Sequence, residues 1–255
     1  MDTERILKFS GEMGRQLMEN GAEIYRVEES VRRILKAYGC HQTEVFAIPS
    51  FMVVNVETGE RNYVRSLRSR PTSLNLRRLH RLNALCREIC QHTPPVEEAE
   101  ARFREILEEP LYGRWASYLA YGLVAFFFTL FWGGSLADAV AAFPSGLIVR
   151  LLVRFMSKVQ ANVFFTNLVT SMLLAIPPLA FEMAGLPLAV DKIIIGTIML
   201  LVPGLAITNV MRDVLAGDFL TALTRFAEVL IVAMGISIGI AMAITGTRAL
   251  AAWAM

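Results

Sequence analysis

Residues 115–133, WASYLAYGLVAFFFTLFWG, form an apolar stretch without a single charged side chain. About 20 mainly apolar residues in a helix are enough to cross the hydrocarbon core of a bilayer. Upstream of this stretch, residues 1–114 hold 18 of the 25 Lys and Arg residues and 17 of the 23 Asp and Glu residues. So sharp a change of composition indicates a domain boundary near residues 111–115, between a charged part and an apolar part.

The apolar part contains five stretches that predict membrane-spanning helices, at residues 115–133, 136–155, 162–184, 188–209 and 219–245. A soluble protein with very apolar core helices is a poor alternative, because these stretches leave no polar face for water. Cytoplasmic loops are enriched in Lys and Arg. Placing the charged part inside also places Arg150, Arg154, Lys158 and Arg212 inside, and leaves Lys192 and Arg248 outside. We therefore expect a multi-pass protein of the cytoplasmic (inner) membrane, with its N-terminus in the cytoplasm and its C-terminus outside.

The charged part, residues 1–112, is expected to be a small cytoplasmic α+β domain, and residues 113–255 to be the transmembrane bundle. Apolar residues at helical spacing predict helices over residues 3–19, 22–38, 74–91 and 96–109. Residues 43–48, 51–56 and 61–67 are instead typical of strands, with turns at Pro49-Ser50 and around residues 57–60. The fold class is thus mainly α, with a small sheet near the N-terminus.

The fourth apolar stretch is interrupted by Pro203-Gly204. A proline within a membrane helix removes a backbone hydrogen bond, and the freed polar groups must face protein or a water-filled cavity. Broken helices of this kind form substrate sites in many transporters. Thr208 and Asn209 add polar side chains just beyond the break, which makes this segment a candidate substrate-binding or transport site.

Charged residues follow the break at Arg212, Asp213, Asp218, Arg225 and Glu228. Ionisable residues within or beside membrane helices are functional candidates, with a partner of opposite charge. The nearest partners in sequence pair Arg212 with Asp213 or Asp218, and Arg225 with Glu228. The alternative interpretation is a simple kink followed by a solvated cytoplasmic loop.

A second candidate is the N-terminal motif that contains Glu23, Tyr25, Arg26 and Glu28, close together at the start of a helix. These side chains could grip a ligand or brace the membrane part. By themselves they are more typical of a surface face with ion pairs, and this alternative stays open.

The sequence predicts neither an enzyme nor a metal site. His80, Cys86, Cys90 and His92 lie close in sequence, but Cys86 shares the apolar face of its helix and is expected to pack in the core. No Gly-x-x-x-x-Gly-Lys phosphate-binding loop and no Gly-x-Ser-x-Gly elbow is present. The small net charge of +2 gives no reason to expect a nucleic-acid partner. We expect no cofactor.

Three segments resemble the threonine/serine exporter (ThrE-like) family: NGAEIYRVEES at residues 20–30, EVFAIPS at 44–50 and LVPGLAITNVMRDVLAGD at 201–218. The resemblance implies secondary transport that exports small hydrophilic metabolites. Single-chain exporters of this family have about ten spans, so five spans resemble its split, YjjP-type form. That form works with a smaller YjjB-type membrane subunit and is associated with succinate export. The motif positions carried over are Glu23, Arg26, Glu28, Pro203, Gly204, Thr208, Asn209, Arg212, Asp213 and Asp218.

Taken together, these features predict a membrane subunit of a secondary exporter for threonine/serine-like amino acids or small dicarboxylates such as succinate. Coupling to the proton gradient would use Asp213, Asp218 or Glu228. The alternative is a membrane-anchored regulatory or ligand-sensing protein. An anchor would need neither a broken helix nor charges within the membrane part, so the sequence favours transport.

Overall fold

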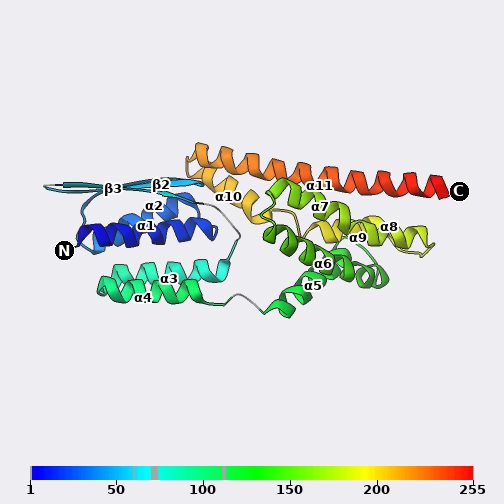
Figure 1. Ribbon diagram of the computed structural model, residues 1–255, viewed down its shortest axis with the longest axis horizontal. Coiled ribbons are helices and arrows are strands. Elements are labelled where there is room, and N and C mark those ends of the chain that lie inside the picture. Colours follow the sequence, from blue (N-terminus) through cyan, green and yellow to red (C-terminus); the bar gives the residue numbers. More distant parts are fainter. Residues whose placement is uncertain (1, 60, 70–73, 111–112, 255) are drawn as a thin grey trace. The chain divides into compact units, whose positions relative to one another are not determined.

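The computed structural model describes residues 2–59, 61–69, 74–110 and 113–254, with side chains up to residue 249 (Figure 1). The chain forms two compact units. Unit 1 consists of Met1–Pro110 and Ala206–Phe226, and unit 2 of Leu111–Leu205 and Ala227–Met255. The division suggested by composition alone gave the whole of residues 113–255 to the membrane part, whereas the structure groups residues 206–226 with the N-terminal elements.

Unit 1 contains the helices and strands that the sequence pattern predicts for the charged part. They are α1 (Thr3–Glu19), α2 (Ile24–Ala37), β1 (Gln42–Ile48), β2 (Phe51–Thr58), β3 (Arg61–Arg68), α3 (Leu76–His92) and α4 (Val96–Glu108). The strands form one antiparallel sheet in the order β1-β2-β3. Ile48 pairs with Phe51 across the first turn, and Thr58 pairs with Arg61 across the second.

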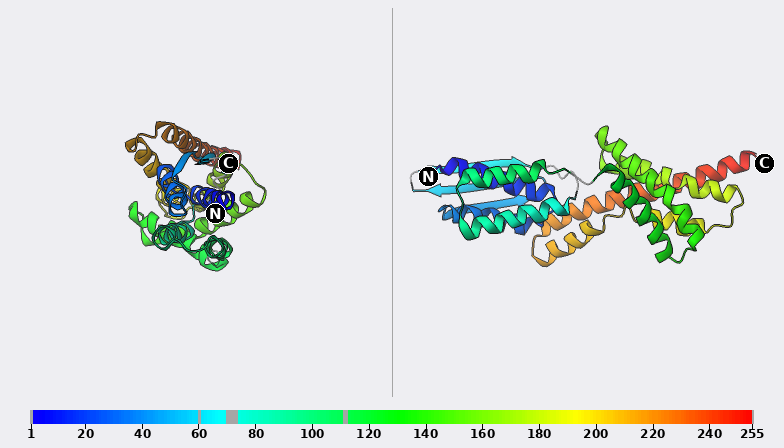
Figure 2. Two further views of the ribbon diagram at one scale, coloured as in Figure 1. Left: turned by 90° about the vertical axis from the view of Figure 1, so that its left-hand side faces the viewer. Right: turned by 90° about the horizontal axis from the view of Figure 1, so that it is seen from below.

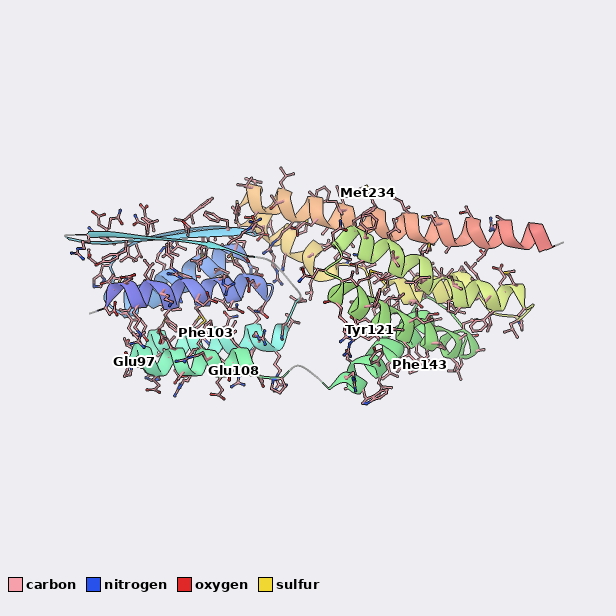
Figure 3. The ribbon with its side chains drawn as sticks, in the orientation of Figure 1. Glu97, Phe103, Glu108, Tyr121, Phe143 and Met234 are labelled. Carbon is pink, nitrogen blue, oxygen red and sulfur yellow. The ribbon has the colours of Figure 1, made fainter. Side chains whose placement is uncertain are left out.

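In unit 1, α1 and α2 lie between the sheet and the pair α3 and α4 (Figure 1). Alternate residues of β2, such as Met52 and Val54, face the helices and are fully buried with Met13 of α1 and Val31 of α2. Side chains in a strand point alternately to its two faces, so one face of the sheet supplies this core. Phe103 of α4 meets the ring of Phe9 of α1 edge-on, with 5.9 Å between ring centroids (Figure 3).

The remaining part of unit 1 is a helical hairpin. It consists of most of α10 (Gly204–Leu215) and the first two turns of α11 (Phe219–Ala254). Gly217 has φ of +83°, a left-handed conformation that costs glycine little and lets the chain reverse between the two helices. α11 is one uninterrupted helix of 36 residues (Figure 2).

Unit 2 is helical throughout its described elements. It contains α5 (Arg114–Phe131), α6 (Leu136–Lys158), α7 (Val163–Leu174), α8 (Ile176–Met183), α9 (Val190–Ile198) and the rest of α11. Within the described residues, four helical segments are long and apolar enough to cross a membrane, namely α5, α6, the segment Val163–Met183 formed by α7 and α8, and Phe219–Ala249 of α11. Each matches one of the predicted spans.

The fifth predicted span, residues 188–209, is not a single helix. α9 has 9 residues and α10 has 12, with non-helical residues between them. A helix rises 1.5 Å per residue, so α9 is about 14 Å long, half the thickness of the hydrocarbon core. Proline at position 203 explains the interruption, because it lacks an N–H and disfavours helical backbone in the residue before it.

Small residues allow the helices of unit 2 to approach each other closely. A Cβ on Gly146 of α6 would lie 2.5 Å from the Tyr121 carbonyl oxygen of α5, and Gly122 faces the ring of Phe143 (Figure 3).

α5 and α6 are joined by a short connection, so they run antiparallel. The amide of Ala189, just before α9, donates to Asp138 at the first turn of α6 with a distance of 2.7 Å. α9 therefore begins at the end of the bundle opposite Lys158.

α7 and α11 run in the same direction. Gly235 of α11 faces the carbonyl oxygen of Phe164, and Gly239, one turn further on, faces Leu168 and Ser171. Because the contacts advance together along both helices, the helices are parallel. α7 begins just after α6 ends, so the part of α11 in unit 2 also begins at the Lys158 end of the bundle.

Candidate functional site

The predicted break at Pro203 and Gly204 lies between two short helices. α9 ends at Ile198, and the backbone that follows makes only short-range bonds, such as the one from the Leu201 amide to the Ile198 carbonyl oxygen (2.8 Å). Pro203 cannot donate a backbone hydrogen bond. α10 begins at Gly204, and the first-turn amides of any helix have no acceptor within that helix. The segment therefore provides the start of a half-helix, as the sequence predicts.

Thr208 and Asn209 follow one turn into α10. The Thr208 side chain is exposed and Asn209 is partly buried. Both belong to unit 1, whereas Pro203 and Gly204 belong to unit 2. The break thus coincides with the passage of the chain from one compact unit to the other.

Glu23, in the N-terminal motif, is a buried carboxylate with three partners. Its side chain is only 7% exposed, and it accepts a hydrogen bond from Nη1 of Arg212 at 2.5 Å. It lies 2.5 Å from Nε of Arg26 and accepts a hydrogen bond from the Tyr25 hydroxyl at 3.1 Å. Burial raises the pKa of Glu23, but the hydrogen bonds from Arg212 and Tyr25 and the charge of Arg26 outweigh it and hold that pKa below its ordinary value. Glu23 is therefore held charged.

Asp213 is the second buried carboxylate of this region. It has no exposed surface, and Oδ2 lies 3.1 Å from Nη1 of Arg225. The two groups are not aligned for a hydrogen bond, and within the described residues neither carboxylate oxygen accepts one. Burial raises the pKa of Asp213, Arg225 lowers it, and the negative charges of Asp218 and Glu23 raise it, so that it lies above its ordinary value. The side chain is thus buried, paired by charge alone, and readier than an ordinary aspartate to bind a proton.

Arg225 also links the hairpin to the N-terminal motif. Its Nη2 donates to the carbonyl oxygen of Ala22 at 3.0 Å, next to the bond between Glu23 and Arg212. Consecutive residues of the first motif, Ala22 and Glu23, therefore bind two arginines of the second region. We call the group formed by Ala22, Glu23, Arg212, Asp213 and Arg225 the motif junction.

These ion pairs correct the pairing expected from sequence proximity. Arg212 binds Glu23, and Arg225 binds Asp213. The expected partner of Arg212 was Asp213 or Asp218, and that of Arg225 was Glu228. Neighbours i and i+1 on a helix do not face each other, so Arg212 and Asp213 point to different partners. Glu228 lies one turn beyond Arg225 and is exposed.

Asp218 and Glu28 support the backbone around the motif junction. Asp218 accepts a hydrogen bond from the Thr221 amide at 3.2 Å, which makes it the N-cap of α11. Glu28 accepts one from the Ala47 amide at 2.7 Å and so ties α2 to β1. Burial raises the pKa of Glu28, the Ala47 amide opposes this, and the charge of Asp218 adds to it.

The structure also reveals a buried carboxylate that the sequence interpretation passed over. Asp138, 3% exposed, accepts hydrogen bonds from the Ser135 amide and hydroxyl and from the Ala189 amide, each at 2.7 Å. It thereby caps α6 and holds the start of α9. Two signals were available: a charge at the edge of an apolar stretch, and the Ser-x-x-Asp spacing of a capping box.

The cysteine and histidine cluster gives no metal site within the described residues. Cys86 is buried in the core of unit 1, and burial raises the pKa of its thiol to about 12. A thiol that stays protonated is a poor metal ligand.

The four helices that are long and apolar enough to cross a membrane place the chain among α-helical membrane proteins. More particularly, the chain belongs to the threonine/serine exporter family, ThrE, whose family model matches residues 8–246. No solved structure matches the chain.

Curated proteins to which the chain is similar fall into two size classes. The chain is 25% identical over 247 residues to the threonine/serine exporter of Corynebacterium glutamicum, covering 94% of this chain and 50% of that protein. It is 26% identical over 239 residues to the "Probable succinate transporter subunit YjjP" of Klebsiella aerogenes, covering 90% of this chain and 89% of that protein. The Escherichia coli protein of the same name is 23% identical, with 96% and 97% covered. The chain thus spans about half the length of the threonine/serine exporters it matches.

Proposed function

We propose that this chain is one membrane subunit of a secondary exporter for threonine/serine-like amino acids or small dicarboxylates such as succinate, and that it works with a second, smaller membrane subunit of the YjjB type. The observation that carries the proposal is the difference in coverage. The chain aligns with nearly the full length of proteins named as transporter subunits, but with only half of the exporters that bear the family's name. A second subunit would supply the other half.

The bundle directions support five crossings of the inner membrane. α9 begins at the Asp138 end of unit 2, and the unit 2 part of α11 begins at the Lys158 end. In the proposed topology the interrupted segment, residues 188–209, crosses the bilayer between these two ends, although α9 alone is too short to do so. Four long helices and one interrupted crossing give five, with the N-terminus cytoplasmic and the C-terminus outside. A second five-span half would then have inverted topology, which is a common transporter design.

The substrate would bind at the interrupted crossing. The start of a half-helix presents the positive end of the helix dipole, which favours a carboxylate. Gly204 begins α10, and Thr208 and Asn209 offer polar side chains one turn further on. Threonine, serine and succinate all present a carboxylate. Of the three acids expected to carry protons, Asp213 suits coupling best, because it is buried beside Arg225 and binds protons more readily than an ordinary aspartate.

The alternative, a membrane-anchored regulatory or ligand-sensing protein, does not need these features. An anchor is most stable with continuous helices and without a buried ion pair, since removing charges from water costs several kcal/mol. Burying Glu23, Asp213 and Arg225 costs free energy. A transport role would account for this cost, whereas a membrane anchor would not.

The test is an efflux assay in cells that lack this gene. Fed a threonine- or serine-containing dipeptide, the deletion strain should accumulate the free amino acid inside the cell, and a parallel assay follows succinate efflux. In cells that lack the genes of both subunits, efflux should return only when the two chains are expressed together. If neither solute changes in efflux while both chains are present in the membrane, the exporter proposal is wrong.

A further inference from the structure

A hollow with basic and aromatic walls lies between α5 and α6 at one end of unit 2. Its volume is about 610 Å³. It is lined by Arg114, Trp115, Tyr118, Leu147, Ile148, Leu151, Arg154, Phe155 and Lys158. None of the residues predicted for transport belongs to it.

The hollow gathers three cations at one membrane surface. Arg114 is the first residue of α5 and Lys158 is the last of α6, so the antiparallel helices bring both to the same side, with Arg154 one turn deeper. The lining contains no Asp or Glu. Within the described residues no ion pair includes any of the three cations. Their positive charge is therefore not neutralised by the surrounding part of the chain.

Beside and below the cations, the hollow is lined by exposed aromatic and aliphatic side chains. Leu151 and Phe155 are each 56% exposed, and Trp115 is 78% exposed. Aromatic side chains of this kind prefer the level of the lipid headgroups, and basic side chains beside a membrane helix attract anionic lipids. The hollow has its cations with Trp115 and Phe155 near one surface and Leu151, Ile148 and Leu147 deeper, which matches a phospholipid from headgroup to chain.

We propose that this hollow, the α5–α6 hollow, is a binding site for an anionic phospholipid. The cations bind the phosphate and the headgroup charge, and Leu151, about one turn deeper than Arg154, contacts the upper part of an acyl chain. The lipid would stabilise the junction at which α5 enters the membrane.

The test uses the fluorescence of Trp115 in the full-length chain. The protein has three tryptophans, so Trp132→Phe and Trp253→Phe leave Trp115 as the only one. This variant is reconstituted in phosphatidylcholine vesicles with increasing mole fractions of brominated phosphatidylglycerol, or of brominated phosphatidylcholine as the zwitterionic probe. Bromine quenches tryptophan only on close approach.

Trp115 should be quenched at a lower mole fraction by the anionic probe than by the zwitterionic one. In the single-tryptophan background, Arg154→Gln with Lys158→Gln should weaken this preference about fivefold for each charge removed, the factor that ~1 kcal/mol per basic residue predicts. Lys192→Gln with Arg248→Gln removes two charges of unit 2 outside the hollow and should leave the preference unchanged. Arg154→Lys should retain most of it.

Three results would overturn the proposal. Equal quenching by both probes would mean that lipid contacts Trp115 irrespective of the charge of the lipid headgroup. Equal losses in the two double variants would mean that only the total charge matters. Absence of quenching by either probe would mean that protein, such as a second copy of the chain, covers the hollow. Circular dichroism of each variant confirms that it is folded, and none of these results depends on the transported substrate.

Discussion

Glu23 shows how a single side chain can join two segments that lie 189 positions apart. A buried carboxylate is stable only when hydrogen bonds and opposite charges replace the water that it loses. Arg212, Arg26 and Tyr25 provide these partners. Arg212 remains 55% exposed, so its own loss should cost less than the loss of the buried acid.

Glu23→Gln should lower the thermal stability of the purified protein, by about 1–3 kcal/mol, because a charged hydrogen-bond acceptor is lost in a buried place. Arg212→Gln should cost about 1 kcal/mol or less, as is usual for a partly exposed partner. Glu29→Gln is the matched control, since Glu29 lies on the same helix, is half-exposed and pairs with Arg33. Thermal unfolding in detergent measures all three. Equal stability of the Glu23 and Glu29 variants would contradict a structural role of Glu23.

Asp213 makes the second residue-scale prediction. Asp213→Asn should reduce efflux at least about tenfold while the amount of protein in the membrane stays similar, because the side chain keeps its shape but no longer exchanges a proton. Glu228→Gln removes a charge from an exposed position of the same region and should have a smaller effect. Equal efflux by wild type and the Asp213 variant would return Asp213 to a purely structural role.

The raised pKa of Asp213 also predicts a pH dependence of stability. Between the ordinary aspartate pKa, about 3.9, and the higher folded value, the folded chain binds more protons than the unfolded chain. The contribution of Asp213 to stability must therefore rise as the pH falls through this window. Glu23 has the opposite sign, because its lowered pKa gives stability that is lost as the pH falls through its folded pKa. Subtracting the thermal unfolding of Asp213→Asn from that of wild type at each pH isolates the contribution of Asp213, and a flat difference would contradict the prediction.

At the scale of elements, unit 2 is held together where small residues let helices touch. Lipid tails are as apolar as leucine, so packing and hydrogen bonds hold membrane helices together instead of exclusion from water. Gly239 of α11 meets the backbone of α7, and the nearby Ser171 hydroxyl approaches the Gly235 carbonyl oxygen to 3.4 Å.

Gly239→Ala should destabilise the bundle, because a Cβ there would overlap the Leu168 carbonyl oxygen and the Ser171 hydroxyl. Overpacking of this kind costs about 1–3 kcal/mol. Gly246→Ala is the matched control in the same helix, since a Cβ at that position has no atom within 4 Å. The midpoint of thermal unfolding in detergent should fall for the first variant only. A similar midpoint for both variants would mean that the close contact between α7 and α11 does not contribute to the stability of the bundle.

For the whole molecule, the number of crossings decides how the chain can pair with another subunit. Five crossings place the two ends of the chain on opposite sides of the membrane, whereas four would place them on the same side. The interrupted segment between α9 and α10 is therefore the element on which the proposed inverted pairing depends.

A reporter fused after Met255 tests this topology. Alkaline phosphatase, active only outside the cytoplasm, should be active there, and green fluorescent protein, which folds only in the cytoplasm when exported by this route, should be dark. A fusion after Lys158 should give the reverse pattern, since α6 ends on the cytoplasmic side in the proposed topology. A fluorescent C-terminal fusion would contradict the five crossings.

The sequence by itself determined the elements, because they depend on local pattern. Apolar spacing located the helices and strands of the charged part, length and hydropathy located the four long membrane segments, and Pro203 marked the break. The sequence also identified most residues of the motif junction, through their similarity to a known family. These features lie within windows of a few residues to about 20, which local propensity and periodicity describe well.

Only the tertiary structure decided the partners. Arg212 and Asp213 are adjacent in sequence, yet a helix turns their side chains toward different neighbours, and each binds a residue that was not expected from sequence proximity. The role of the Ala22 carbonyl oxygen in binding Arg225 has no side-chain signal at all. Asp138 holds the start of α9 through a contact 51 positions away. Such pairings are set by how the helices pack in space, and nothing in the order of residues along the chain specifies which distant groups will meet.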